Sequence, residues 1–226
     1  MTTRLSVIVP CYNEVRTILS VIEQVQTLRD RFDLEIIVVD DGSIDGTFES
    51  LRAVEGIKLE RHEKNKGKGA AIATGLAKAT GDIVVIQDAD LEYEPKEIPV
   101  LVDPILSRKC DIVCGSRFKG NITGMTFSHY VANKILSFFT SVLYGAEVTD
   151  VMTGHHAFRA SVFKELTLES TRFELELEVT VKALRKGYSI CEIPTTYSTR
   201  NFGEAKIGWA DGFQCLLKLL KYRLGF

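Results

Sequence analysis

Several features of secreted and membrane-spanning chains are missing from this sequence of 226 residues. No apolar run reaches the ~18 residues that a membrane-spanning helix needs. The apolar start, residues 5–10, is too short for a signal peptide. The five cysteines are odd in number and lack CxxC spacing, which argues against a disulfide framework or a zinc site. We therefore expect reduced thiols in a cytoplasmic protein.

An excess of charge of one sign is also missing. The formal net charge is -2, so no field of the whole chain attracts nucleic acid, and we expect no nucleic-acid partner. Repeats, low-complexity segments and long linkers are absent too. With 45% hydrophobic residues, the chain can bury an ordinary core, so we expect one domain over residues 1–226.

The first half alternates strand-like and helix-like segments. Strands are expected at residues 5–10, 34–40, 57–61, 83–87 and 111–114, and helices at 14–30, 45–54 and 69–80. This alternation predicts βαβ units, and so an α/β, Rossmann-like domain whose central, mostly parallel sheet is flanked by helices. Ligands of such sheets bind beyond the carboxyl ends of the strands, which places the chemistry after Val9, Val39 and Gln87.

The second half is less regular and begins near residue 119. Helices are expected at Phe127–Tyr144, Leu175–Lys186 and Trp209–Leu224. A strand is expected at residues 188–193, ended by Pro194.

Acidic residues follow the strand at residues 83–87. In an extended segment, side chains two apart point the same way, so Asp88 and Asp90 would converge, with Glu92 close by. Clustered carboxylates repel unless a cation lies between them, and Mg²⁺ or Mn²⁺ prefers oxygen ligands, often with phosphates. This spacing predicts a metal–diphosphate site. The alternative is that these acids cap a helix near Pro95 or face water.

Two further segments fit a nucleotide site. Asp40 and Asp41 end a buried strand, where a carboxylate can accept hydrogen bonds from a base or ribose; a plain turn is the alternative. Residues 64–69 form a basic, glycine-containing loop before a helix, where Lys68 and backbone N–H groups could meet phosphate. The loop lacks the spacing of a P-loop, and a helix start punctuated by glycine is the other interpretation.

These motifs occur together along nearly the whole chain. They are Pro10-x-Tyr12-Asn13-Glu14, Asp40-Asp41-Gly42-Ser43-x-Asp45-Gly46-Thr47, Gln87-Asp88-Ala89-Asp90, Gly115-Ser116-Arg117-Phe118, Asp150-Val151-Met152-Thr153-Gly154 and Arg200-x-x-Gly203-Glu204-x-Lys206. In this the chain resembles the family 2 glycosyltransferases of GT-A fold. It is most similar to the polyprenyl-phosphate (dolichyl-phosphate) mannose and glucose synthases.

The resemblance implies roles for individual residues. It implies a nucleotide-sugar site made of Pro10, Tyr12, Glu14, Val39, Asp40, Asp41, Lys68, Asp88, Ala89, Asp90 and Lys206. It makes Asp88, Asp90, Arg117 and Arg200 catalytic, with Mg²⁺ or Mn²⁺ on Asp88, Asp90 and Glu92. It places the acceptor phosphate on Arg117, His129 and Asn133. Residues 1–118 would then bind the nucleotide sugar, and residues 119–226 the acceptor.

The sequence departs from those synthases at two places. They often carry Arg-Gly-Glu-Ser-Lys in the closing loop, where this chain has Phe202-Gly203-Glu204-Ala205-Lys206, and His129 stands where an arginine is familiar. The resemblance thus implies GDP-mannose or UDP-glucose as donor and polyprenyl phosphate as acceptor, while these departures leave the sugar and the lipid open.

The acceptor decides whether a general base is needed. A phosphate acceptor is ionised at neutral pH and needs cations, whereas a hydroxyl acceptor needs a base. Glu176, Glu178 and Asp150 are the candidate bases; a solvated helix face is the alternative for the glutamates, and capping for Asp150. A nucleotidyltransferase and a non-catalytic nucleotide-sugar-binding module are further alternatives.

Two apolar segments suggest contact with the cytoplasmic face of a membrane. Residues 135–144 are rich in phenylalanine and leucine, and residues 209–226 mix leucines with Lys218, Lys221 and Arg223. Basic residues beside apolar ones suit an amphipathic helix on an anionic surface. The alternative is packing on the core or on a second subunit, and the oligomeric state stays open.

Overall fold

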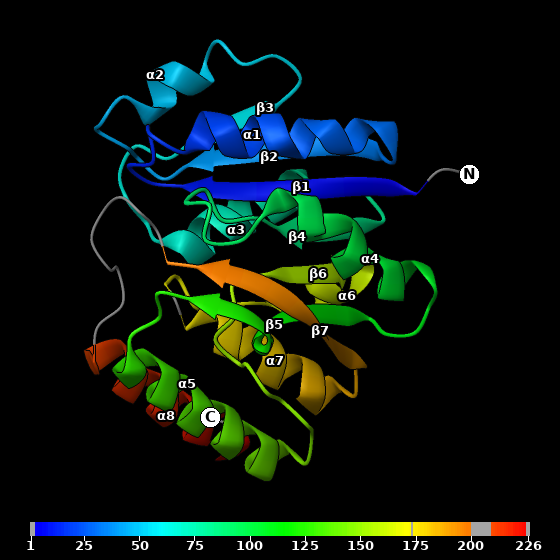
Figure 1. The fold of residues 1–226 in the computed structure, drawn as a ribbon, viewed down its shortest axis with the longest axis vertical. Helices are drawn as coiled ribbons and strands as arrows, with labels where there is room; N and C mark the ends of the chain where they lie inside the picture. The colour runs from blue at the N-terminus through cyan, green and yellow to red at the C-terminus, as the bar shows by residue number, and fades with distance from the viewer. Residues whose placement is uncertain (1–2, 173, 200–208, 225–226) are drawn as a thin grey trace.

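Seven strands form one sheet in the residues that the computed structural model describes, which are 3–172, 174–199 and 209–224. The order across the sheet is β3-β2-β1-β4-β6-β5-β7 (Figure 1). The strands are β1 (Arg4–Cys11), β2 (Asp33–Asp40), β3 (Lys58–Arg61), β4 (Ile83–Ile86), β5 (Ile112–Thr123), β6 (His156–Arg159) and β7 (Ile190–Ser198). Only β6 runs antiparallel to its neighbours among these strands, which confirms the predicted α/β fold with a mostly parallel sheet.

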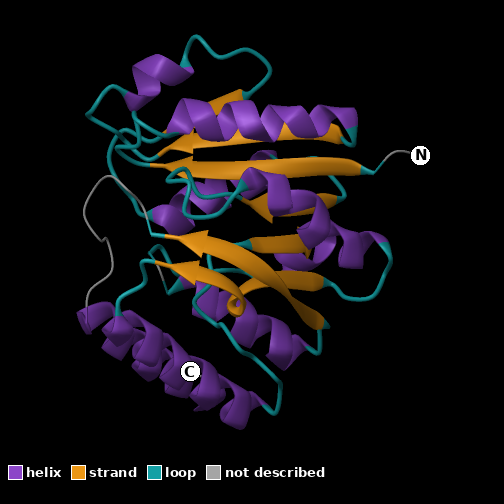
Figure 2. Cartoon of the chain, viewed as in Figure 1, coloured by secondary structure: helices purple, strands orange, loops and turns teal. Residues whose placement is uncertain are grey.

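Helices cover both faces of the sheet (Figure 2). One face packs against α1 (Ile18–Gln26), the short helix η1 (Thr27–Asp30) and α4 (Ile98–Leu106), and the other against α3 (Lys68–Lys78), α6 (Ala160–Glu165) and α7 (Leu175–Lys186). Short helices α2 (Thr47–Leu51) and η2 (Pro95–Glu97) lie in the connections. Strand side chains alternate as the pleat requires: Val7 and Val9 face α1, whereas Ile8 faces α3.

A further layer lies beyond α7. Helices α5 (Phe127–Tyr144) and α8 (Trp209–Leu224) run beside each other below α7 in Figure 1. Leu175 and Val179 of α7 pack toward the sheet, while Leu177 and Val181 pack toward α5 and α8. Buried apolar side chains on two sides explain why α7 lacks the single apolar stripe of a surface helix.

In the second half, the three expected helices are found with the predicted bounds. The expected strand is found with different bounds. Strand β7 continues through Pro194 to Ser198, so the expectation that Pro194 ends it is wrong. Proline lacks the N–H of a sheet ladder, but β7 is an edge strand, and Pro194 lies where its register with β5 shifts.

Within the described ranges, no helix is both long and apolar enough to cross a bilayer. All five cysteines have free thiols. The pairing of Cys11 with Asp40 and of Ile8 with Ile86 brings the carboxyl ends of β1, β2 and β4 to one edge of the sheet, where the sequence predicts the chemistry.

Candidate functional site

The loops after β1 and β2 are joined by hydrogen bonds. The backbone N–H of Asn13 donates to Ser43 Oγ (2.9 Å), and the N–H of Ile44 donates to Asn13 Oδ1 (3.0 Å). The N–H of Glu14 donates to Thr47 Oγ1 (2.9 Å). These bonds fix the rim on which the predicted nucleotide ligands lie: buried Pro10, and half-buried Tyr12 and Glu14.

Asp40 is fully buried at the end of β2, next to the equally buried Val39. Its Oδ2 accepts from the Ser43 N–H (3.3 Å) and lies 3.3 Å from Arg61 Nε. Its Oδ1 has no hydrogen-bond partner among the described residues. A buried carboxylate oxygen without a partner is costly, so Asp40 can accept a hydrogen bond from a bound molecule.

Asp41 holds the basic loop against the sheet. Its carboxylate accepts from the N–H groups of Lys66 (2.9 Å) and Gly67 (2.8 Å), and it pairs with His62 Nδ1 (2.6 Å). His62 is in turn bonded to Thr74 of α3 (2.9 Å). Asp41 therefore positions the start of α3 in this structure.

The start of α3 is pressed against the segment before α7. A Cβ on Gly67 would lie 2.2 Å from the carbonyl oxygen of Thr171, and one on Gly69 would lie 2.1 Å from that of Ser170. Gly67 also has a φ of 98°, which glycine tolerates best. This close backbone approach sets where Lys68 emerges.

Lys68 joins two carboxylates from distant parts of the chain. Its Nζ lies 2.8 Å from Asp88 Oδ1 after β4 and 2.9 Å from Glu176 Oε1 in the first turn of α7. Burial would lower the pKa of Lys68, but the two carboxylates outweigh it and raise the pKa. Burial raises the pKa of Glu176, and its Oε2 has no described partner. Glu176 is buried, so a solvated helix face is the wrong alternative for it.

A glycine makes room for Asp88. A Cβ on Gly154 would lie 2.6 Å from Asp88 Oδ2 and 3.2 Å from Lys68 Nζ. The Gly154 N–H donates to the Tyr93 hydroxyl (3.3 Å). The segment before β6, which the sequence singles out only by resemblance, thus forms one wall of the cluster around Asp88.

Asp90 and Glu92 lie in a turn and not in an extended segment. The Glu92 N–H donates to Asp90 Oδ1 (3.0 Å), Leu91 has a φ of 61°, and the Glu92 carboxylate accepts from the Tyr197 hydroxyl of β7. Alternation along a strand is therefore the wrong reason to expect Asp88 and Asp90 together. Among described residues, no three His, Cys, Asp or Glu side chains form a metal-binding group, so a site with Glu92 stays a prediction.

Arg117 forms a buried, bidentate pair with Asp150. The distances are 2.7 Å from Nε to Oδ2 and 2.7 Å from Nη2 to Oδ1, and the Arg117 N–H adds a third bond. Glu192 of β7 accepts from the N–H groups of Thr149 (2.8 Å) and Asp150 (3.1 Å). Asp150 is thus the partner of Arg117 and is itself held by Glu192, a lone strand glutamate that no sequence pattern singles out.

The predicted acceptor ligands His129 and Asn133 lie on α5, which follows Arg117 in the chain. His129 is exposed and Asn133 half-buried. The ring of Phe118, next to Arg117, contacts Tyr130 of α5 at 5.1 Å between centroids. Arg200 and Lys206 lie outside the described residues.

Glu178 has structural partners, and the two histidines beside the site are buried. Glu178 accepts from the N–H groups of Glu169 (2.9 Å) and Ser170 (2.7 Å) and pairs with Lys182, so it is neither a free base nor on a solvated face. His155 and His156 are buried, and burial lowers their pKa values to about 4 and about 3.

Comparison with known proteins gives consistent matches. A model of glycosyl transferase family 2 matches residues 6–167. A UDP-N-acetylglucosamine–dolichyl-phosphate N-acetylglucosaminyltransferase of Methanococcus voltae is 33% identical over 96% of this chain and 95% of that protein. A dolichol-phosphate mannosyltransferase of Pyrococcus furiosus is 30% identical over 98% of this chain and 63% of that protein.

Solved structures share the fold. A glucosyl-3-phosphoglycerate synthase of Mycobacterium tuberculosis, in complex with Mn²⁺, UDP and phosphoglyceric acid, superimposes with a TM-score of 0.75. It is 25% identical, and the match covers 98% of this chain and 78% of that one. The same synthase with Mg²⁺ and UDP gives a TM-score of 0.74 over 97% of this chain and 79% of that one, at 25% identity.

Proposed function

Because the chain belongs to glycosyl transferase family 2 and is thus a glycosyltransferase, we propose that it moves a sugar from a nucleotide-diphosphate sugar to a polyprenyl phosphate. The observation that carries the proposal is the cluster of the half-buried Lys68 and Asp88 with the buried Glu176 at the carboxyl edge of the sheet. The two dolichyl-phosphate sugar transferases similar to this chain support the class of acceptor.

The nucleoside would lie on the rim formed by the loops after β1 and β2. The free oxygen of Asp40 suits a ribose hydroxyl or a base N–H, and Tyr12 and Glu14 flank the rim. The relatives name UDP-N-acetylglucosamine and a mannosyl transfer. UDP-N-acetylglucosamine therefore joins GDP-mannose and UDP-glucose as a candidate donor.

The diphosphate would lie beyond β4. Asp88 and Asp90 offer carboxylate oxygens. Two further buried oxygens have no partner among the described residues: Oε1 of Gln87, the residue before Asp88, and Oε2 of Glu176, which Lys68 links to Asp88. Such a donor set fits a hard divalent ion, and Mg²⁺ or Mn²⁺ held there would stabilise charge on the departing diphosphate. Lys68, protonated in this site, adds a fixed cation beside the same carboxylate.

The acceptor phosphate attacks the anomeric carbon, and the bond from that carbon to the diphosphate breaks. A phosphate monoester is ionised at neutral pH, so it needs orienting cations and no general base. Arg117, His129 and Asn133 are the proposed ligands, with Arg200 and Lys206 from the segment outside the described residues. The exposed apolar residues of α5 suit the polyprenyl-bearing membrane beside them.

The competing hypothesis is transfer to a hydroxyl, which one observation favours. Lys68 links Glu176 to Asp88, and the raised pKa of Glu176 suits a group that takes up a proton. In that case Glu176→Gln would abolish turnover and leave donor binding intact. If phosphate is the acceptor, the same variant keeps a measurable share of turnover.

A transfer assay tests the proposal. The purified chain is incubated with radiolabelled UDP-N-acetylglucosamine, UDP-glucose or GDP-mannose and detergent-dispersed polyprenyl phosphate, with Mn²⁺, Mg²⁺ or a chelator. We expect one donor to label the organic-extractable lipid in a metal-dependent way. We expect Asp90→Asn to lower the rate at least about a hundredfold, as loss of transition-state charge stabilisation does.

Asp103→Asn is the matched control, because Asp103 is an exposed aspartate on α4 whose ion pair, within the described part of the chain, is with the equally exposed Arg31. Its rate should stay within about twofold of the parent. Lipid labelling by none of the donors, together with labelling of a soluble hydroxyl acceptor, would refute the phosphate acceptor.

A further inference from the structure

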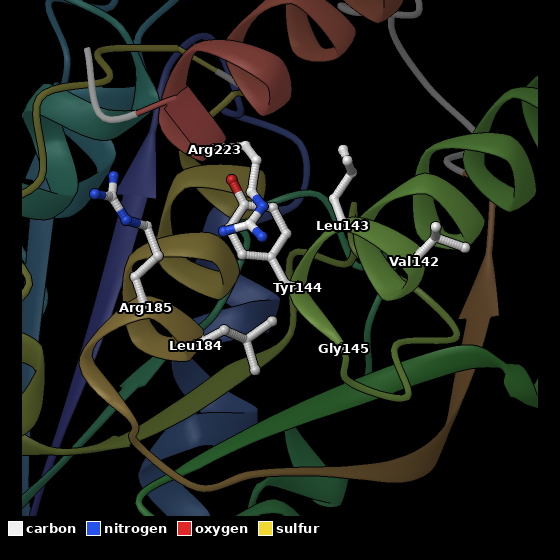
Figure 3. Close-up of a pocket in the computed structure, with 7 residues that line it drawn as sticks. All are labelled: Val142, Leu143, Tyr144, Gly145, Leu184, Arg185 and Arg223. Carbon is white, nitrogen blue, oxygen red and sulfur yellow. The ribbon is translucent and has the colours of Figure 1, made fainter.

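A pocket of about 530 Å³ lies where three helices end, away from the cluster around Asp88. Its lining residues come from the last turns of α5, α7 and α8 (Figure 3): Val142, Leu143, Tyr144, Gly145, Leu184, Arg185 and Arg223. Arg185 stands nine residues after Glu176 on α7, which is about 14 Å along a helix axis. The pocket is therefore separate from the sugar-transfer site.

Two arginines give the pocket its charge. Arg185 Nη1 donates to the carbonyl of Tyr222 (2.6 Å), and Arg223 is exposed at the pocket. No ion pair links either arginine to a carboxylate within the described parts of the chain. Lys182, one turn earlier on α7, has two carboxylate partners, Glu169 and Glu178. The contrast leaves two guanidinium groups at one pocket without an acidic side chain of the described residues to compensate them.

The surroundings favour an anion with an oxygen-rich headgroup. Guanidinium groups bind phosphate with two parallel N–H···O bonds, and Arg185 keeps donors beyond the one used on Tyr222. The Tyr144 hydroxyl, which donates to the Leu219 carbonyl (3.1 Å), places a further polar group in the pocket.

An apolar stripe leads to the pocket along α5. Its members are exposed although they are large and apolar: Phe127, Tyr130, Ile135, Phe138, Phe139 and Val142. Phe127 is 81% exposed, and Phe138 and Val142 are each 63% exposed. At roughly 100° per residue, the six positions fall within about half of the helix circumference, so they lie on one side of the helix. Val142 belongs both to the stripe and to the pocket, so the charged pocket lies at the end of the apolar surface.

We propose that the pocket binds the phosphate headgroup of an anionic membrane phospholipid while the α5 stripe rests in the apolar layer of the same leaflet. The inference rests on the proposed function, because a polyprenyl phosphate acceptor is what would bring α5 to a bilayer. The headgroup is distinct from the acceptor: it is bound and not consumed. It anchors the end of α5 that lies far from Arg117.

Vesicle flotation of the whole chain tests this site. The vesicles contain phosphatidylcholine alone or with phosphatidylglycerol, and contain no polyprenyl phosphate and no nucleotide sugar. Arg223→Ala should lower the partition onto phosphatidylglycerol vesicles more than about fivefold, where fivefold corresponds to the ~1 kcal/mol of one basic residue near an anionic surface. Partition onto pure phosphatidylcholine should not change.

Lys221→Ala is the matched control, since Lys221 is exposed on the same helix and does not line the pocket. It should lose no more than about fivefold. Equal losses of partition for the two variants would mean that the positive charge of α8 attracts the anionic surface without a specific site, and would overturn headgroup binding in the pocket. Arg223→Lys keeps the charge without the planar fork, so partial recovery supports the site and full recovery argues against it.

Two further measurements separate headgroup binding from other causes of lost partition. Arg185→Lys, followed by thermal unfolding, separates headgroup binding from the bond to Tyr222: lost partition at an unchanged melting temperature supports the site. Stabilisation of the chain by millimolar inorganic phosphate, abolished by Arg223→Ala while partition onto phosphatidylglycerol vesicles stays unchanged, would point to a soluble anion and refute the lipid. Because neither measurement uses sugar transfer, failure of the proposed function would show separately.

Discussion

At the scale of single residues, burial decides what an ion pair is worth in this molecule. Arg117 with Asp150 and Arg31 with Asp103 have similar distances, 2.7 Å and 2.9 Å. The first pair is buried and the second is about half exposed on both sides. Water solvates the exposed Arg31 and Asp103 well even when they are apart. The buried guanidinium of Arg117 has no water to replace a lost carboxylate partner.

We expect Asp150→Ala to lower the free energy of unfolding by about 3–5 kcal/mol, because it leaves the buried Arg117 unpaired. Asp103→Ala, the matched change at the exposed pair, should alter it by less than about 1 kcal/mol. Urea unfolding of both variants measures the difference. Equal effects would show that Arg117 finds another partner or water.

The absence of a side chain at Gly154 is a second residue-scale feature with a consequence for activity. In Gly154→Ala the new Cβ would meet Asp88 Oδ2 at 2.6 Å, which the carboxylate can relieve only by moving. A shift of about 1 Å in a catalytic group costs on the order of a hundredfold in rate. We expect that loss of kcat at a nearly unchanged melting temperature, since a side chain and not the backbone yields.

Transfer assays and thermal unfolding on the same preparation check this expectation. A fall of the melting temperature by many degrees would assign Gly154 to folding. Unchanged kcat would mean that Asp88 need not keep its present position.

At the scale of elements, sequence periodicity predicted most of the fold and missed the parts that other elements determine. Helix α5 was predictable with its bounds from its composition. Strand β6 (His156–Arg159) lacks the β-branched apolar run by which the equally short β4 was predicted, and it is a strand because β4 and β5 bond to it on both sides. Helix α4 contains Pro104 in its interior, which opposes helix formation locally, and is held by burial of Ile98 and Leu101.

The contact of α3 with β1 shows packing outweighing propensity. Gly75 lies inside α3, where alanine would form helix better by about 1 kcal/mol. Its Cβ, however, would lie 2.5 Å from Cγ2 of the fully buried Ile8. Overpacking costs about 1–3 kcal/mol, so after the propensity gain we expect Gly75→Ala to be net destabilising by up to about 2 kcal/mol.

Ala77→Gly, at an exposed position of the same helix, measures the propensity contribution for α3 by chemical denaturation. Subtracting it gives the packing contribution at Gly75. A stabilised Gly75→Ala would show that β1 moves to accept the methyl group.

At the scale of the whole molecule, the candidate site joins segments that no local pattern connects. The spacing of Asp88 and Asp90 is visible in the sequence, and so is the glycine-containing start of α3. The bond from Lys68 to Glu176 spans 108 residues, and it exists only because the sheet and α7 bring both ends together. Sequence could therefore name most candidate ligands but not which of them neutralise one another.

The acid stability of the molecule follows from its buried histidines. The pKa of His155 is lowered to about 4 by burial, and that of His156 to about 3 by burial, Lys68 and His155. Unfolded histidines bind a proton near pH 6.5, so the unfolded state takes up protons first as the pH falls. Each histidine should lower the free energy of unfolding by about 1.4 kcal/mol per pH unit between about pH 6 and its folded pKa.

Urea unfolding at pH 7.5, 6 and 5 measures this slope. His156→Phe keeps an aromatic ring beside Phe158 and removes one titrating group, so the slope should fall by about half. A slope that His156→Phe leaves unchanged would assign the acid sensitivity to other groups.

The long β5 has a consequence for how this enzyme would meet its substrate. After its register shift, β5 stays paired with β7 from Asn121–Thr196 to Thr123–Ser198, and α5 begins four residues later. Backbone hydrogen bonds thus fix the stand-off between Arg117 and α5. On the proposed bilayer, this rigid spacer would set the height at which chemistry occurs, so lipid phosphates would be selected by their depth in the leaflet as well as by their shape.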